Sequence, residues 1–279
     1  MTHSTVLITG ATGRSGRRVD HLLRARGVPT RPASRSAPQP FDWHDRATWP
    51  GVLDGCGSAY LCYSPDLAFP GVDSIIAEFT AAAVERGVRR LVLLSGRGEA
   101  GARTCEDIVL DAPVAATVVR CAWFQENFSE HFLRDGVLTG RIAMPAGAVT
   151  EPFVGLDDVA EVAVRVLTTG GFDGRVVELT GPESIGFERA ATILSSALGR
   201  EIAYQPVDVA TFVSAAVTAG LDRTGAESLG ALVTGVLDGR NQATTDTVER
   251  VLGRPATTFE QYARRAAAAG AWASAGAAR

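Results

Sequence analysis

Short apolar runs alternate with amphipathic stretches along most of the chain. The first apolar run covers residues 6–9, and Val19, Leu22 and Leu23 then recur at the spacing of one helix face. Later segments are strand candidates at 29–34, 58–64, 88–96, 116–121 and 176–179, with a short strand end at 41–43. Stretches at 72–86 and 156–167 predict helices. This alternation predicts the α/β class, with a doubly wound parallel sheet.

A glycine-rich turn joins the first predicted strand to the first predicted helix. Residues 10–16 read GATGRSG. The first glycine permits a tight turn, the second lets backbone amides approach a pyrophosphate, and the third lets the helix pack closely on the strand. The helix N-terminus adds unpaired N–H groups and the positive end of a dipole. The turn therefore predicts a dinucleotide site, with a glycine-rich loop that binds nothing as the alternative.

The residues around the second predicted strand favour a phosphorylated dinucleotide. In NAD-binding members of this architecture, an acidic residue at the end of that strand bonds the ribose 2′-hydroxyl. No acidic residue lies between Gly27 and Phe41, whereas Arg31 and Arg35 do. Arg35, at the strand's end, suits a 2′-phosphate, and Arg14 could add to it. The sequence predicts NADP(H); a solvated surface arginine is the alternative, and it fits Arg31 better.

The chain is expected to divide into two parts. Residues 1–150, extended by 155–182, should form a Rossmann domain, and residues 183–279 a smaller α/β region on the substrate side. Further predicted elements are helices at 105–110, 188–198, 210–219 and 246–252 and a strand at 201–206, while 97–104 is expected to be a loop. The alanine-rich tail, 264–279, is expected to fray.

Composition restricts the partners and the compartment. The 279 residues are 46% hydrophobic and 21% charged, which is ordinary for a globular protein with a sizeable core. The net charge of -4 gives no reason to expect a nucleic acid or an anionic membrane as partner. No stretch predicts a bilayer span or a signal peptide, so a cytoplasmic protein is expected. A homodimer is left open.

Three residue types limit the available chemistry. The four cysteines are scattered without metal-ligand spacing, and the four histidines offer no cluster, so reduced thiols and no metal site are expected. The chain contains no lysine, because all 27 basic residues are arginine. A lysine Schiff base, a P-loop lysine and a lysine-assisted proton relay are therefore excluded.

Several segments in combination resemble the NmrA-like atypical short-chain dehydrogenases/reductases. They are the glycine turn, Ser95-Gly96, and the segments 120–127, 155–160 and 246–255. The resemblance implies a Rossmann domain that binds NADP(H), with Arg35 on the 2′-phosphate and Ser95 near the nicotinamide ribose. It places the pyrophosphate on Gly10, Thr12, Gly13, Arg14, Ser15 and Gly16. Positions at strand ends add Asp42, as a partner for the adenine amino group, and Tyr63.

The chain departs from the wider superfamily in its catalytic residues. Ordinary short-chain dehydrogenases use a Tyr and a Lys four residues later, but this chain has no Lys and no Tyr between Tyr63 and Tyr204. Hydride transfer would then rest on positioning, with a weaker or solvent-derived acid. A quinone suits that limitation, because its reduced oxyanion is stabilised by the ring. Candidate residues for an aromatic pocket are Cys121, Trp123, Phe124, Phe128 and Phe153.

Each of these candidates has a structural alternative. Phe128 and Phe153 are equally well explained as core residues. His131 is a candidate proton donor or a plain helix-surface histidine. Asn127 is a candidate substrate ligand or a turn cap, and Glu126 is expected to be solvated.

Two classes of function remain. The first is an NADP(H)-dependent oxidoreductase or tailoring enzyme that acts on a quinone or aromatic carbonyl, including a tailoring step other than simple reduction. The second is a non-catalytic NADP(H)-binding redox sensor. The sensor would need a protein partner, because the chain has no basic arm for DNA.

Overall fold

The computed structural model describes residues 4–273, which form two compact units. The first unit contains the chain up to Cys121 together with Leu156–Leu179 and Thr247–Arg254. The second contains Ala122–Gly155, Thr180–Asp246 and the chain from Pro255 onward. The second unit thus begins at Ala122, earlier than the expected division after residue 150, because the aromatic side chains that follow Ala122 pack into its core.

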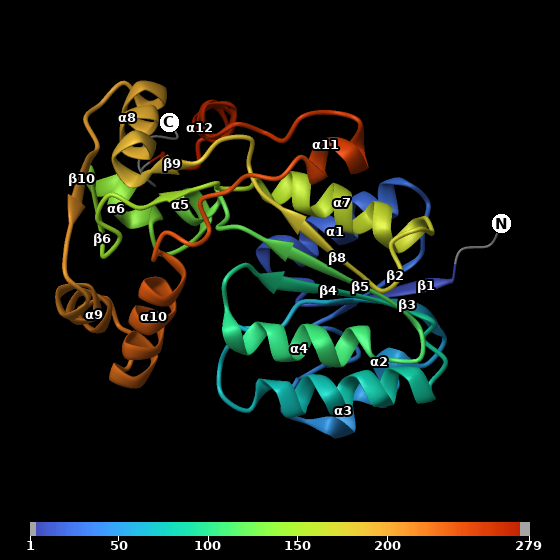
Figure 1. Cartoon of the computed structure of the whole chain (residues 1–279). Helices are drawn as coiled ribbons and strands as arrows, with labels where there is room; N and C mark the ends of the chain where they lie inside the picture. The colour runs from blue at the N-terminus through green and yellow to red at the C-terminus, as the bar shows by residue number, and fades with distance from the viewer. Residues whose placement is uncertain (1–3, 274–279) are drawn as a thin grey trace. The chain divides into compact units, whose positions relative to one another are not determined.

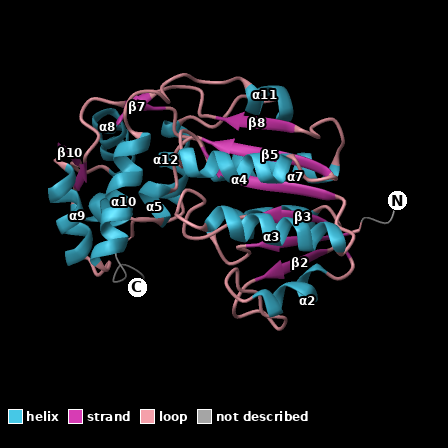
Figure 2. Cartoon of the chain, turned by 60° about the horizontal axis from the view of Figure 1, so that its bottom comes forward, coloured by secondary structure: helices cyan, strands magenta, loops and turns pink. Residues whose placement is uncertain are grey.

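The first unit is built on one six-stranded parallel sheet with the order β2-β1-β3-β4-β5-β8 (Figures 1 and 2). The strands are β1 (Thr5–Thr9), β2 (Thr30–Ala33), β3 (Cys56–Leu61), β4 (Arg90–Gly96), β5 (Ala115–Cys121) and β8 (Arg175–Leu179). Every neighbouring pair is parallel, so all six carboxyl ends lie along one edge. The strand order reverses between β1 and β3, which makes this point the topological switch. The predicted doubly wound α/β fold is confirmed.

Helices cover both faces of this sheet. They are α1 (Arg14–Ala25), α2 (Trp49–Leu53) after a short 3₁₀ turn (Arg46–Thr48), α3 (Val72–Glu85), α4 (Ala100–Leu110), α7 (Leu156–Thr168) and α11 (Thr247–Leu252). Helices α3 and α4 pack together on one face, and α1 and α7 pack together on the other (Figure 1).

Two local predictions for the first unit are wrong. Residues 41–43 form no strand, because the backbone of Asp42 is held in a turn by the side chains of Thr48 and Trp49. Helix α4 begins at Ala100, inside the segment expected to be a loop. A Cβ at Gly101 would lie only 2.6 Å from the carbonyl oxygen of Ala68, so this glycine allows a close approach within the helix and does not break it.

The second unit combines six helices with two small two-stranded sheets. The helices are α5 (Asn127–Glu130), α6 (Arg134–Thr139), α8 (Phe187–Leu198), α9 (Val209–Thr218), α10 (Arg223–Val236) and α12 (Phe259–Ala268). The sheets pair β6 (Arg141–Met144) with β10 (Ala203–Pro206) in parallel and β7 (Thr150–Glu151) with β9 (Ile185–Gly186) in antiparallel. Phenylalanine rings at 128, 153, 187 and 259 form its centre.

The expected fraying of the tail is wrong for the residues that the structure describes. Helix α12 continues to Ala268, and a capping box at Thr258 and Gln261 fixes its start. Trp272 is buried, and its Nε1 donates to the carbonyl oxygen of Phe128 at 2.7 Å. Residues 274–279 lie outside the described part. Within residues 4–273, none of the helices has the length and apolar character needed to cross a bilayer.

Candidate functional site

The glycine turn between β1 and α1 has the geometry that its sequence predicts. Gly10 has a φ of +63°, a left-handed conformation that glycine adopts without strain. A Cβ at Gly16 would lie 2.7 Å from the carbonyl carbon of Gly10, so the helix packs directly on the turn. Gly13 occupies the N-cap of α1 without a capping side chain, and the first turn of α1 contains no acidic residue. The N-terminus of α1 is therefore suited to an anion.

The side chains of the other residues in the turn differ in how exposed they are to solvent. Thr12 is exposed and Arg14 is half-buried. Ser15 is buried, and its hydroxyl lies 3.4 Å from the sulfur of Cys62, just after β3. Ser15 thus turns its side chain inward, which leaves its backbone N–H as the group available to a ligand.

The two arginines near β2 have different environments. Arg31 donates to the carbonyl oxygen of Val52 at 3.0 Å, which ties it to α2 and supports the structural interpretation of this residue. Arg35 lies two residues beyond β2, and its exposed side chain makes no hydrogen bond or ion pair with residues 4–273. Its guanidinium is therefore available for a ligand at the carboxyl end of β2.

Tyr63 belongs to an aromatic cluster beside the sheet, and Asp42 lies next to a member of that cluster, Trp43. The Asp42 carboxylate accepts from the backbone N–H of His44 at 2.9 Å. The Tyr63 ring is buried 5.3 Å from the Trp43 ring, with its hydroxyl 3.4 Å from Nε2 of His44. Burial, followed by the charge of Asp42, raises the pKa of Tyr63 above its usual value, so its hydroxyl stays neutral near pH 7.

Ser95 is part of a buried ionic network at the end of β4. Its hydroxyl donates to Glu106 at 2.6 Å, and Nε of Arg120 donates to the same carboxylate at 2.9 Å. Arg120 also pairs with Glu178 at 3.3 Å, and Arg97 pairs with Glu178 at 3.0 Å. The Ser95 side chain therefore supports the ends of β4 and β5. The Glu106 carboxylate raises the pKa of Arg120, which keeps that guanidinium charged.

Two carboxyl groups that the sequence analysis did not single out lie at the same edge. Glu99 follows β4, and its carboxyl group lies so close to Gly96 that a Cβ there would collide with it. Asp66 follows β3 and accepts from the N–H of Ala68 at 2.8 Å. The carboxyl groups of Asp66 and Glu99 are hydrogen-bonded to each other. A search for titratable residues just after each predicted strand would have found both.

The pKa values of this pair are raised. Burial is the largest cause for Glu99, followed by the charge of Asp66, and together with weaker effects they raise the pKa of Glu99 to about 9. Burial also raises the pKa of Asp66. Two carboxylates in direct contact cannot both remain ionised, so the pair holds a proton at neutral pH.

The predicted pocket residues lie in several environments. Phe128 and Phe153 are 0% and 2% exposed, and their rings meet edge to face at 5.4 Å, so the pocket interpretation of these two is wrong and the core interpretation holds. Trp123 and Phe124 are half-buried. Cys121, at the end of β5, is buried, which raises the pKa of its thiol far above the usual value.

The predicted catalytic candidates and their neighbour Glu126 also differ in burial. His131 is exposed just after α5, with its ring packed edge-on against Phe132 at 5.2 Å. Asn127 is 8% exposed, and its carbonyl oxygen accepts from Leu133. Glu126 is 3% exposed, so the expectation that it is solvated is wrong. The turn before α5 is buried in the second unit, and Glu126 is buried with it.

Comparisons with known proteins place this geometry in a family. No protein-family model matches the chain. Agroclavine dehydrogenase of Claviceps purpurea is 32% identical over 227 residues, which cover 72% of this chain and 75% of the relative. The NmrA negative transcriptional regulator, solved with NAD, matches with a TM-score of 0.73 at 16% identity over 95% of both chains. This chain belongs to the NmrA-like atypical short-chain dehydrogenases/reductases.

A third comparison matches an enzyme from Escherichia coli. The NADPH-dependent quinone oxidoreductase QOR2 has a TM-score of 0.74 at 22% identity, and the match covers 93% of this chain and 98% of that one. Like the match to NmrA, it shows that the fold is shared.

In this NmrA-like chain, one edge of the sheet carries most of the predicted cofactor residues. The glycine turn follows β1, Arg35 follows β2, Tyr63 follows β3 and Ser95 lies near the end of β4. The acidic pair, Asp66 and Glu99, lies at this edge too. The turn leaves little room for a side chain at Gly13, since a Cβ there would lie 3.1 Å from the carbonyl oxygen of Gly10. Without a side chain at this position, the backbone amides can approach a pyrophosphate.

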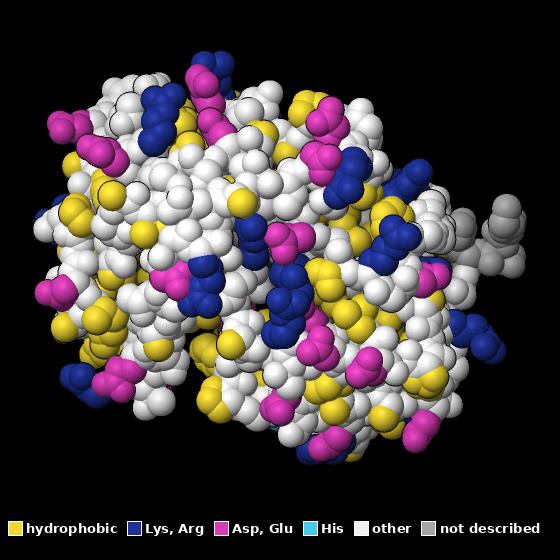
Figure 3. All heavy atoms as spheres, in the orientation of Figure 1, with side chains coloured by type: hydrophobic (Ala, Val, Ile, Leu, Met, Phe, Trp, Pro, Cys, Tyr) yellow, Lys and Arg dark blue, Asp and Glu magenta, His cyan; other side chains and the backbone are white. Residues whose placement is uncertain are grey.

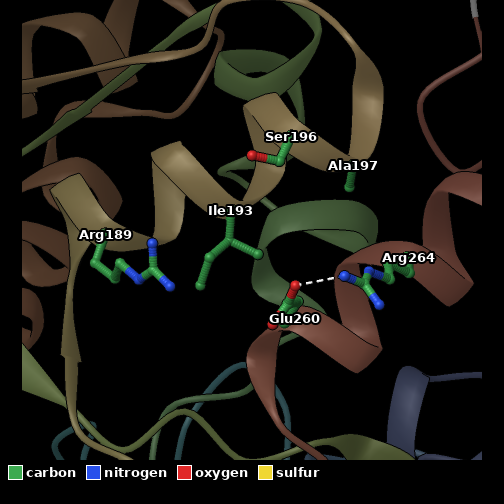
Figure 4. A pocket seen from close by; sticks show the side chains of 6 residues that line it. All are labelled: Arg189, Ile193, Ser196, Ala197, Glu260 and Arg264. Atoms are coloured by element: carbon green, nitrogen blue, oxygen red, sulfur yellow. Dashed lines mark hydrogen bonds and ion pairs between the residues drawn. The ribbon is translucent and has the colours of Figure 1, made fainter.

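Outside the edge of the sheet, other chemistry could rest on the surface charges, one groove or possible metal ligands of the described residues. Arginine and acidic side chains are interspersed over the face in Figure 3. A groove of about 270 Å³ lies between α8 and α12 (Figure 4), where Arg264 pairs with Glu260 at 2.6 Å and Arg189 lies at the other end. Across residues 4–273, no three metal-binding side chains come together.

Proposed function

We propose that the protein is an NADP(H)-dependent oxidoreductase that reduces a quinone or another aromatic carbonyl. The observation that carries this proposal is the uncapped N-terminus of α1 behind the turn of Gly10, Gly13 and Gly16. The N–H groups at this helix N-terminus and the helix dipole favour a pyrophosphate.

Named residues would hold each part of the cofactor. The backbone from Gly13 to Gly16 would bind the pyrophosphate, and Arg35 would pair with the 2′-phosphate. Asp42 and Tyr63 are proposed near the adenine and the remainder of the cofactor. When bound, the cofactor supplies a hydride, while the protein supplies position and electrostatics.

The acceptor class rests on the second unit and on the relatives. Trp123 and Phe124 are half-buried aromatic side chains of the kind that bind flat acceptors. The Escherichia coli structure is named for quinone reduction with NADPH, and the Claviceps relative is a dehydrogenase. Acceptor-dependent oxidation of NADPH by the wild-type protein tests this proposal, since a redox sensor would bind NADPH without consuming it.

Arg35 should discriminate between the two nicotinamide cofactors. Replacing Arg35 with Ala removes a charge-assisted contact of ~1.5–3 kcal/mol with the 2′-phosphate, so NADPH affinity should fall by about tenfold or more. NADH lacks that phosphate, and its affinity should change little. Titration calorimetry of both cofactors against both proteins measures the difference. An equal loss for NADPH and NADH would show that Arg35 does not select the cofactor.

A further inference from the structure

We infer that the hydrogen-bonded carboxyl pair of Asp66 and Glu99 supplies the proton that a quinone or carbonyl oxygen takes up during reduction. The inference rests on the proposed oxidoreductase function and adds the acid that this function requires. The chain has no lysine, and no tyrosine lies between Tyr63 and Tyr204, so the ordinary relay cannot supply the proton.

The pair lies on the edge of the sheet where a ligand is expected on independent grounds. Strands β3 and β4 are parallel neighbours, with Leu61 opposite Leu93, so residues that follow them emerge at the same edge. β3 also pairs with β1, which leads into the glycine turn. Ligands of open α/β sheets bind beyond the carboxyl ends of the strands at the topological switch point. The turn therefore directs a dinucleotide to this edge.

The local backbone is adapted to the Glu99 carboxyl group. Gly96, the last residue of β4, leaves the space that the carboxyl occupies, and any side chain there would displace it. Asp66 is fixed by the N–H of Ala68, whose carbonyl packs against Gly101 in the first turn of α4. Asp66 is thus held by a backbone hydrogen bond, and the Glu99 carboxyl group lies against the backbone of Gly96.

The surrounding charges keep the pair protonated. Burial and the neighbouring carboxyl groups of Asp66 and Glu106 raise the pKa of Glu99 to about 9. The charge of Glu106 is offset by Arg120, while Arg103 lies 4.0 Å from the same carboxylate. At pH 7 Glu99 is the protonated partner and donates to Asp66, and its proton is lost only as the pH approaches its raised pKa.

In the proposed step, the acceptor takes up a hydride from the cofactor and a proton from Glu99. The hydride brings two electrons and one hydrogen to the acceptor. The O–H bond of Glu99 breaks as a new O–H bond forms on the acceptor oxygen, and the electron pair of the broken bond remains on the Glu99 carboxylate. Glu99 is half-buried, so solvent can return a proton before the next turnover.

Two acceptors with different proton requirements test this role. A quinone needs a hydride and a proton, whereas a cationic triarylmethane dye needs only a hydride and becomes neutral. Replacing Glu99 with Gln should lower kcat for the quinone by about 100-fold or more, because a positioned acid contributes that much. The same change should leave kcat for the dye and NADPH affinity within about threefold, well below that contribution.

Two further variants distinguish an effect of the Asp66–Glu99 pair from the loss of any negative charge. Asp66→Asn should also lower quinone reduction, since it alters the partner that holds the proton. Asp73→Asn removes an exposed carboxylate near the start of α3 and should leave both acceptors unaffected.

Infrared spectroscopy gives a readout that does not depend on turnover. The wild type should show a protonated carboxyl band at pH 7 that disappears near the raised pKa of Glu99 and is absent from E99Q. An E99Q variant that reduces the quinone at the wild-type rate, loses both acceptors equally, or keeps the band would overturn the role of Glu99. A wild type that fails to bind NADPH, or binds it and reduces neither acceptor, would instead overturn the proposed function.

Discussion

Replacing Gly13 with Asp should abolish measurable NADPH binding, with a fall in affinity of at least about 100-fold, or ~2.7 kcal/mol. Gly13 is the N-cap of α1, with extended backbone angles of φ −79° and ψ 177°. Aspartate adopts that conformation and is a favoured N-cap residue, so the variant should fold. Its Cβ would lie 3.1 Å from the carbonyl oxygen of Gly10, so the turn must shift slightly and some stability should be lost. Its carboxylate would then occupy the N-terminus of α1, where the pyrophosphate needs the N–H groups, and would repel it.

Gly13→Asn is the matched control, because asparagine has nearly the same shape without the charge. It should lose less affinity than Gly13→Asp. Both variants carry the same crowded Cβ, so they should unfold at about the same temperature as each other when no cofactor is present. Fluorescence titration with NADPH measures the three affinities. Unchanged binding in Gly13→Asp would remove the dinucleotide site from the glycine turn.

Replacing Glu106 with Ala should lower the free energy of unfolding by about 3–5 kcal/mol. The Glu106 carboxylate is 1% exposed and accepts from both Ser95 and Arg120. Its removal leaves the Arg120 guanidinium, which is 12% exposed, with Glu178 as its remaining charged partner. Urea denaturation followed by circular dichroism gives the two free energies of unfolding.

An exposed glutamate–arginine pair provides the comparison. Glu260 and Arg264 lie four residues apart on α12, with side chains that are 53% and 72% exposed. Glu260→Ala should therefore cost less than about 0.5 kcal/mol. Equal effects of the two substitutions would mean that the network around Glu106 contributes no more than a surface pair.

The sequence predicted the sheet because its signals are local. Five of the six strands contain a short apolar stretch, whereas β2, with the sequence TRPA, does not. The turn at Gly10 needs a glycine because its φ is positive. The exceptions depend on distant residues. Gly101 looks like a helix breaker until Ala68 is seen packed against it, and 41–43 looks like a strand until Thr48 and Trp49 take its hydrogen bonds.

The candidate site was predicted less completely, because the environment of its side chains also depends on residues that are distant in the sequence. An aromatic side chain such as Phe128 gives no local sign of whether it lines a pocket or fills a core, and its partner Phe259 is 131 positions away. Glu99 and Asp66 are separated by 33 positions, so only the parallel pairing of β3 with β4 shows that they meet. Ser95 was correctly placed at a strand end, but the buried partner of its side chain, Glu106, could not be inferred.

The proposed function is tested most directly by measuring NADPH consumption by the wild-type protein. Absorbance would follow it over a panel of quinones and aromatic ketones, with NADH run in parallel. Oxidation should depend on the acceptor, be fastest with a quinone or aromatic carbonyl, and be faster with NADPH than with NADH. Tight binding of NADPH without oxidation by any acceptor would contradict the proposed function and would favour a redox sensor that acts through a protein partner.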